Sequence, residues 1–149
     1  MNIYVASSWK NNYQKQVVKY LESNGFEVYD FKHPGGDLKY GFHWSEIDLN
    51  YKNLNFDNFK KGLTHKNAEY GFNSDKEAID RCDGCVLVMP CGRSSHLELG
   101  YARGLGKITA IYYPYSEPIE PELMYKFCPI FNDLEEVVNY LKSGKAEAE

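Results

Sequence analysis

Acidic side chains close to one apolar run are the first chemically suggestive feature of this sequence. Glu98 follows the run GCVLVMP by a few residues, and Asp75, Asp80 and Asp83 come just before the run. Hydrolysis of a glycosidic bond needs two such carboxylates: one attacks or stabilises the oxocarbenium-like centre, and the other manages the leaving group. The spacing therefore indicates that Glu98 and one of these aspartates could share a glycosidic reaction.

Glu98 also fits a purely structural role. Ser95-His96-Leu97-Glu98 has the S-x-x-E pattern of a capping box, in which the glutamate bonds back to the amide of the serine. We expect a helix from about Ser95 to Leu105, with Glu98 in its first turn. A helix N-terminus favours an ionised carboxylate by ~0.3–1 kcal/mol, so Glu98 should stay an anion there, as a nucleophile must.

The turn before Glu98 has the composition of an anion site. Gly92 supplies a flexible turn, Arg93 a guanidinium, and Ser94 and Ser95 two hydroxyls beside free helix-end amides. The alternative is an ordinary Gly/Ser turn with a solvated arginine. Both interpretations stay open from the residues alone.

Helix and strand patterns alternate along the chain, which predicts an α/β fold of the flavodoxin or Rossmann kind. We expect a three-layer sandwich with a central five-stranded parallel sheet, in a single domain over residues 1–142 followed by a flexible tail at 143–149. The predicted strands lie in NIYVAS, FEVYDF, VLVM, ITAIYY and CPIF.

A ligand of such a fold sits outside the carboxyl ends of the strands. Ser7 and Trp9 follow the first strand, and a long insertion at residues 33–61 follows the second. Loops of this length are usually lids or binding loops. Trp9 and Trp44 could stack on a planar ligand, and the alternative for Trp44 is packing of the insertion onto the sheet.

Composition and charge exclude several classes of function. A net charge of −4 argues against a protein that coats nucleic acid. The sequence shows neither a membrane span nor a signal peptide, so we expect a cytoplasmic protein with reduced thiols. Cys82 and Cys85 have C-x-x-C spacing, but no second Cys/His pair accompanies them, so we expect core packing and no metal site.

Four strings in the same order resemble the nucleoside 2-deoxyribosyltransferase family and the related 2′-deoxynucleoside 5′-phosphate N-hydrolases. They are IYVASSW, SDKEAIDRCDGCVLVMP, HLELGYARGLGK and ELM, and the resemblance runs from Met1 to about Leu141 except for residues 33–61. It implies a flavodoxin-like fold and a reaction without cofactor. It also implies that Glu98 attacks the anomeric carbon and forms a covalent glycosyl-enzyme, that Asp75 assists at the base or sugar, and that Tyr4 helps hold Glu98.

Two departures from the family pattern bear on the substrate and the assembly. The family transferases carry Asn-Leu-Met near the C-terminus, contributed across a subunit interface, where this chain has Glu122-Leu123-Met124. The resemblance thus implies a homo-oligomer and a substrate contact for Met124. The turn GRSSH is shorter than the acidic turn of the transferases and richer in phosphate-binding groups, which favours a nucleoside 5′-phosphate.

Two other functions fit the same residues. Toll/interleukin-receptor-like domains use a flavodoxin-like fold and a glutamate to break the nicotinamide–ribose bond of NAD, and some of them act in antiviral defence. A non-catalytic nucleotide sensor would need the pocket, with Glu98 only as a capping residue. Release of nicotinamide from NAD would identify the first function, and binding of an unchanged nucleotide would identify the second.

Overall fold

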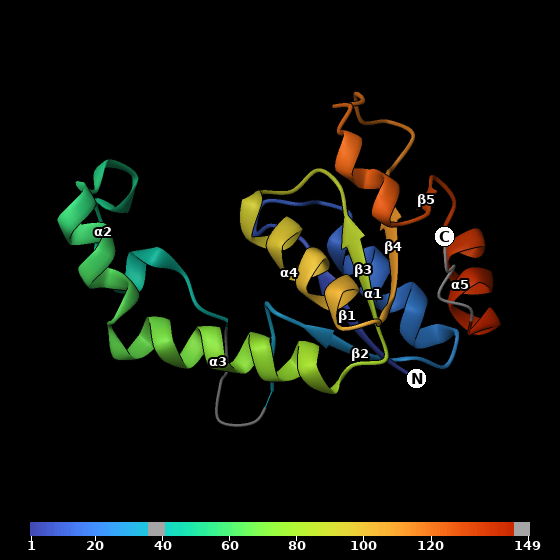
Figure 1. The fold of residues 1–149 in the computed structure, drawn as a ribbon, viewed down its shortest axis with the longest axis horizontal. Helices are drawn as coiled ribbons and strands as arrows, with labels where there is room; N and C mark the ends of the chain where they lie inside the picture. The colour runs from blue at the N-terminus through green and yellow to red at the C-terminus, as the bar shows by residue number, and fades with distance from the viewer. Residues whose placement is uncertain (36–40, 145–149) are drawn as a thin grey trace.

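The computed structural model describes residues 1–35 and 41–144 as an α/β sandwich (Figure 1). Its sheet has five parallel strands in the order β2-β1-β3-β4-β5. This is the flavodoxin-like order, so the predicted fold is confirmed. The strands are β1 (Asn2–Ala6), β2 (Glu27–Asp30), β3 (Gly84–Val88), β4 (Ile108–Tyr112) and β5 (Ile130–Phe131).

Two helical layers cover the sheet because alternate strand residues point to opposite faces. Ile3 and Val5 face α1 (Gln14–Ser23) and α5 (Leu134–Ser143) in one apolar cluster. Tyr4 and Ala6 face α3 (Lys66–Arg81) and α4 (Arg93–Gly104) in the other. α5 ends at Ser143, and residues 145–149 of the predicted tail lie outside the described part of the chain.

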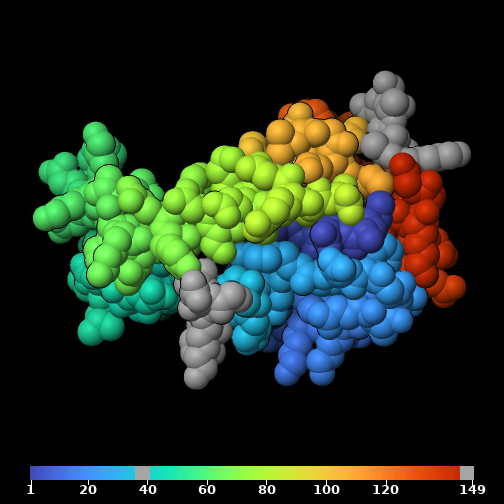
Figure 2. Space-filling view, turned by 90° about the horizontal axis from the view of Figure 1, so that it is seen from below, coloured from blue at the N-terminus to red at the C-terminus, as the bar shows by residue number. Residues whose placement is uncertain are grey.

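The predicted insertion folds into helical segments that stand away from the sheet. It holds η1 (Trp44–Glu46), η2 (Tyr51–Asn53) and α2 (Phe56–Leu63), while its residues 36–40 lie outside the described chain. We call residues 41–72, which add the first part of α3, the arm. Figure 2 shows the arm as a lobe at one end of the molecule. Trp44 packs on Gly62, where a Cβ atom would lie 3.0 Å from its ring, so a glycine in α2 makes room for the indole.

The cysteines belong to the packing of the sheet. All four are free thiols, Cys85 is fully buried, and the Cys82 Sγ donates to the carbonyl of Ile79 at 3.0 Å. Over residues 1–35 and 41–144, no cluster of three or more His, Cys, Asp or Glu side chains could hold a metal ion. In the same ranges, no helix combines the length and the apolar character needed to cross a membrane.

Candidate active site

Four side chains from four elements meet on the side of the sheet covered by α3 and α4. Tyr4 of β1 and Tyr29 of β2 are paired in register, and their rings stack at 5.2 Å with 16° between their planes. The Tyr29 hydroxyl donates to Oδ1 of Asp75 on α3 at 2.9 Å. Glu98 of α4 completes the group, because its carboxyl interacts electrostatically with both Asp75 and Tyr4. The structure thus brings the three predicted catalytic residues together.

The capping role of Glu98 is wrong in this structure. α4 begins at Arg93 with Gly92 as its N-cap, two residues earlier than the sequence predicts. Ser95 is therefore inside the helix, and its hydroxyl donates to the carbonyl of Ser7 at 2.8 Å. Glu98 consequently lies in the second turn of α4, where its side chain has no terminal amide to cap.

The surroundings of Glu98 disfavour the anion that the sequence pattern predicts. Burial and the negative charge of Asp75 raise the pKa of Glu98 to about 8. Burial raises the pKa of Asp75 to about 6, although the hydrogen bond from Tyr29 lowers it. A helix terminus offers only ~0.3–1 kcal/mol, whereas each pKa unit corresponds to about 1.4 kcal/mol, so desolvation dominates. Near pH 7 the pair therefore holds one proton, as a coupled carboxylate dyad does.

The Tyr4 hydroxyl is a buried donor at this dyad. Its oxygen makes no hydrogen bond of normal geometry to the described residues, yet it lies close enough to Glu98 to lower the pKa of that carboxyl. Burial, together with the charges of Glu98 and Asp75, raises the pKa of Tyr4 itself well above its usual value. Tyr4 thus keeps its proton and can donate a hydrogen bond to a carboxylate or to a bound ligand, since a buried hydroxyl without a partner is costly.

The predicted anion site separates into exposed and structural residues. Gly92, Arg93 and Ser94 are exposed at the start of α4, where the first-turn amides have no intrahelical partner. Ser7 and Ser95 are buried instead, and the Ser7 hydroxyl donates to the carbonyl of Val88 at 2.9 Å. Arg93, Ser94 and the helix terminus are thus the groups that are accessible to an anion. The hydroxyls of Ser7 and Ser95 instead bond to backbone carbonyls and connect the loop after β1 with β3 and α4.

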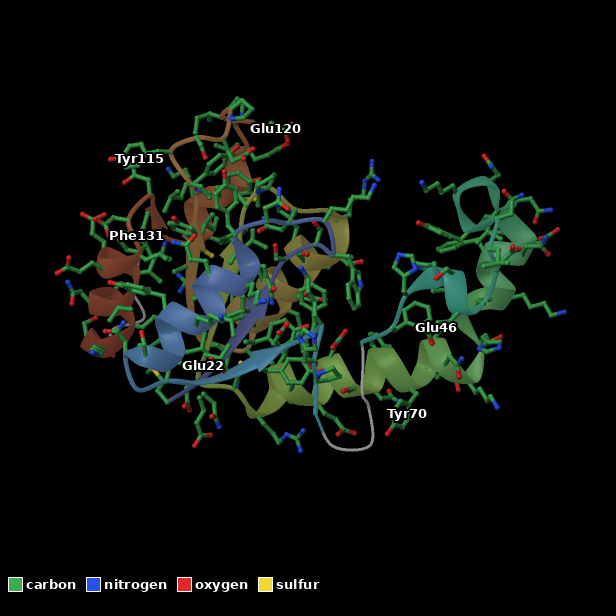
Figure 3. All side chains as sticks on the ribbon, turned by 180° about the vertical axis from the view of Figure 1, so that it is seen from behind. Glu22, Glu46, Tyr70, Tyr115, Glu120 and Phe131 are labelled. Atoms are coloured by element: carbon green, nitrogen blue, oxygen red, sulfur yellow. The ribbon has the colours of Figure 1, made fainter. Side chains whose placement is uncertain are left out.

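Three other predicted binding residues lie on separate elements. Trp9 is 39% exposed in the loop after β1, and its Nε1 donates to the carbonyl of Phe42 at 3.2 Å. Trp44 is in the arm, where it packs against Phe42 and Phe59. Met124 is 61% exposed in η3 (Leu123–Phe127) on the β4–β5 connection. In Figure 3, Glu46 marks the arm and Glu120 marks this connection, at separate parts of the molecule.

Two contacts of this site could not be predicted from the sequence. Tyr29 carries no motif, and only its register with Tyr4 would have revealed it. The ring of His96 lies 2.7 Å from the carbonyl of Gly92 through Nδ1 and 2.9 Å from the Tyr125 hydroxyl through Nε2. Since the carbonyl can only accept, Nδ1 carries a proton in this contact. His96 therefore ties the β4–β5 connection to the start of α4.

Two solved enzyme structures are similar to this chain in fold. No family model and no curated protein matches the sequence. A solved 2-deoxyribosyltransferase from Bacillus psychrosaccharolyticus is 25% identical, with a TM-score of 0.59 over 94% of this chain and 92% of that chain. The CMP N-glycosidase of Clostridium botulinum is 16% identical, with a TM-score of 0.50 over 95% of this chain and 99% of that chain.

The second of these neighbours supports the fold alone, whereas the first also confirms the resemblance that the sequence strings predict. It is an enzyme of the predicted deoxyribosyltransferase type, and the alignment covers nearly the whole of both chains. The chain is thus similar in sequence strings and in structure to the nucleoside 2-deoxyribosyltransferase family.

Proposed function

We propose that this protein cleaves or transfers at the N-glycosidic bond of a nucleoside or, preferably, a nucleoside 5′-phosphate. The observation that carries the proposal is the dyad of Asp75 and Glu98, which lies half-buried between α3 and α4 with pKa values of about 6 and about 8. Neighbouring carboxyl groups whose pKa values are shifted to different extents in this way are typical of acid–base and nucleophilic sites. The similarity to a 2-deoxyribosyltransferase supports the same reaction class.

The dyad offers a balanced route for the reaction. When the proton of the pair moves from Glu98 to Asp75, the charge that raised the pKa of Glu98 disappears and Glu98 becomes the carboxylate. Its oxygen then forms a bond to C1′ while the C1′–N bond breaks, and Asp75 delivers the proton to the departing base. Asp75 next accepts a proton from water, whose oxygen displaces Glu98. Two displacements retain the configuration at C1′.

Tyr4 and Tyr29 would hold the two carboxylates in their separate roles. Tyr29 donates to one oxygen of Asp75, which leaves Oδ2 to face the base. Tyr4 would donate to the Glu98 carboxylate once its proton has left, which satisfies the hydroxyl that otherwise has no partner. Arg93, Ser94 and the N-terminus of α4 would bind the 5′-phosphate, because such termini favour anions.

The test is release of free base from a panel of ribonucleosides, deoxynucleosides and their 5′-monophosphates, with NAD included, followed by chromatography. The proposal expects base release from at least one nucleoside or nucleotide and its loss in Glu98→Gln. Nicotinamide release from NAD alone would move the function to NAD cleavage. A protein that binds nucleotide, leaves it intact for hours and binds equally well as Glu98→Gln would be a sensor.

We also propose that two copies of the chain associate through the outer face of α3 and α4. Leu97 and Tyr101 of α4 and its C-cap residue Leu105 follow one another at four-residue steps and are 75%, 38% and 47% exposed. Lys76 packs over the ring of Tyr101, and Phe72, one turn earlier in α3, is 65% exposed. Exposed apolar side chains gathered on one face in this way are typical of a surface that another protein covers.

Light scattering on Leu97→Glu tests this association. We expect the variant to become a monomer, because a charge would be buried without a partner. Tyr115→Glu is the matched control, since Tyr115 is 83% exposed on the β4–β5 connection, away from the proposed face. A wild-type protein that is already a monomer at high concentration would rule the association out.

A further inference from the structure

Phe42 stands where the arm returns to the sheet. The preceding residue, Gly41, donates its amide to the carbonyl of Lys32 at 3.3 Å, just beyond the end of β2. The Phe42 carbonyl accepts from Nε1 of Trp9, which follows β1. The backbone at Phe42 is therefore held by the segments that directly follow β1 and β2, at the edge of the sheet where ligands of this fold sit.

The side chain of Phe42 rests on α3. A Cβ atom at Gly71 would lie only 2.5 Å from Cβ and 3.1 Å from Cγ of Phe42, so no residue larger than glycine fits there without moving the phenylalanine. Gly71 lies in the middle of a sixteen-residue helix, where glycine is otherwise disfavoured. The missing side chain at Gly71 thus leaves the space on α3 into which Phe42 packs.

Asp75 lies next to this space on α3. It is four residues after Gly71, and residues so spaced share one face of a helix. Helical side chains also tilt toward the N-terminus, so the carboxyl of Asp75 extends toward the turn that holds Phe42. Tyr29 already spans from β2 to Asp75, and Phe42 packs on α3 next to Gly41, which is bonded to Lys32 just after β2.

We infer that the ring of Phe42 is the wall against which the planar base of the substrate packs, directly beside Asp75. Trp9 and Gly71 are the positioning residues that hold this ring in place. The inference rests on the proposed function and adds a specificity-determining residue to it. A phenylalanine offers a flat apolar face without hydrogen bonds, so purines, with more ring area than pyrimidines, gain more from it.

Calorimetric binding of free adenine and free cytosine to wild type, Phe42→Ala and Phe42→Leu tests the inference without relying on turnover. Base–aromatic stacking is lost in both variants, so affinity should fall roughly ten- to a hundredfold, more for adenine than for cytosine. Phe42→Leu keeps an apolar side chain packed on Gly71. An unchanged melting temperature by circular dichroism would show that the lower base affinity of this variant is not caused by unfolding. Phe56→Ala is the control, because Phe56 is 72% exposed in the same arm.

The outcomes separate the inference from the function. If wild type releases base from nucleosides while both Phe42 variants bind bases as tightly as wild type, the inference is wrong and the function stands. If bases bind in a Phe42-dependent way but no substrate is cleaved, the proposed reaction is wrong and the role of Phe42 in base binding is confirmed. Equal losses in Phe56→Ala would show a general effect of the arm and would overturn the inference, and binding of no base by wild type would overturn it as well.

Discussion

The sheet and the arm are built on opposite principles. In the sheet, Tyr4, Val86 and Leu87 are fully buried between two helical layers. In the arm, the buried residues among 41–72 are Gly62, Ala68 and Gly71, while larger apolar side chains such as Leu49, Phe56 and Phe72 are 89%, 72% and 65% exposed.

The difference indicates that the sheet positions side chains rigidly, whereas the arm offers surface for contacts. A closely packed core holds side chains at fixed positions, and the dyad depends on it, because Asp75 and Glu98 are brought together by helices packed on the same face of the sheet. The arm has little core of its own, and its described contacts are aromatic rings seated on small residues. Exposed apolar patches of this kind are typical of interaction surfaces.

The largest expected effect concerns the dyad. Glu98→Gln should lower the rate of base release by about a thousandfold or more, because the nucleophile is lost, and steady-state kinetics on the best substrate measures it. The control is Glu77→Gln on α3, whose side chain is 67% exposed and paired only weakly with Arg81. Equal rates for wild type and Glu98→Gln would show that Glu98 is not the nucleophile.

The same variant tests how the stability of the protein depends on pH. Burial raises the folded-state pKa of Glu98 to about 8, above its ordinary value, so the folded protein binds this proton more tightly than the unfolded chain. The contribution of Glu98 to stability is therefore fully present at low pH and is lost as the pH rises through about 8. Relative to Glu98→Gln, wild type should lose melting temperature between pH 5 and pH 9, and parallel curves would contradict the burial of its charge.

Stability also tests the contrast between the sheet and the arm directly. Leu87→Ala removes a fully buried side chain and should cost about 2–5 kcal/mol of unfolding free energy. Phe56→Ala removes a side chain that is mostly in water and should change it by less than about 0.5 kcal/mol. Urea titrations of both variants measure the difference. A large loss in Phe56→Ala would show that the arm is covered in solution, by a second copy or another element.

Arg93 should affect one class of substrate only. A charge-assisted contact is typically worth ~1.5–3 kcal/mol, so Arg93→Ala should raise KM for a 5′-phosphate substrate roughly ten- to a hundredfold. The unphosphorylated nucleoside should be almost unaffected, because it does not reach the start of α4. Equal losses on both substrates would show that Arg93 supports the fold, and a wild-type preference for the bare nucleoside would contradict phosphate binding.

The smallest expected effect is a shift in pH dependence. Tyr29→Phe removes the hydrogen bond that lowers the pKa of Asp75, so that pKa should rise further above its usual range. The acid limb of the kcat/KM profile should therefore move to higher pH, by about one unit or less, with little change of maximum rate. The Phe59→Leu variant in the arm should leave the profile in place. An unmoved acid limb in Tyr29→Phe would separate Tyr29 from the function of Asp75.

Much of the fold and part of the site could be predicted because they depend on local patterns. Apolar runs separated by amphipathic helices indicate a parallel sheet, and the strings around Asp75 and Glu98 resemble one enzyme family. Tyr29 and Phe42 could not be found in this way. Tyr29 matters only through its register beside Tyr4, and Phe42 only because it packs on Gly71, which is far along the chain.

The sequence by itself determined which carboxylates are available and which elements carry them. The tertiary structure alone decided their chemistry. A helix start two residues earlier than expected moved Glu98 away from the helix terminus, and burial beside Asp75 raised its pKa to about 8 where the sequence pattern predicts an anion. The physical reason is desolvation, which depends on the surroundings that the whole fold assembles around a side chain and not on its neighbours along the chain.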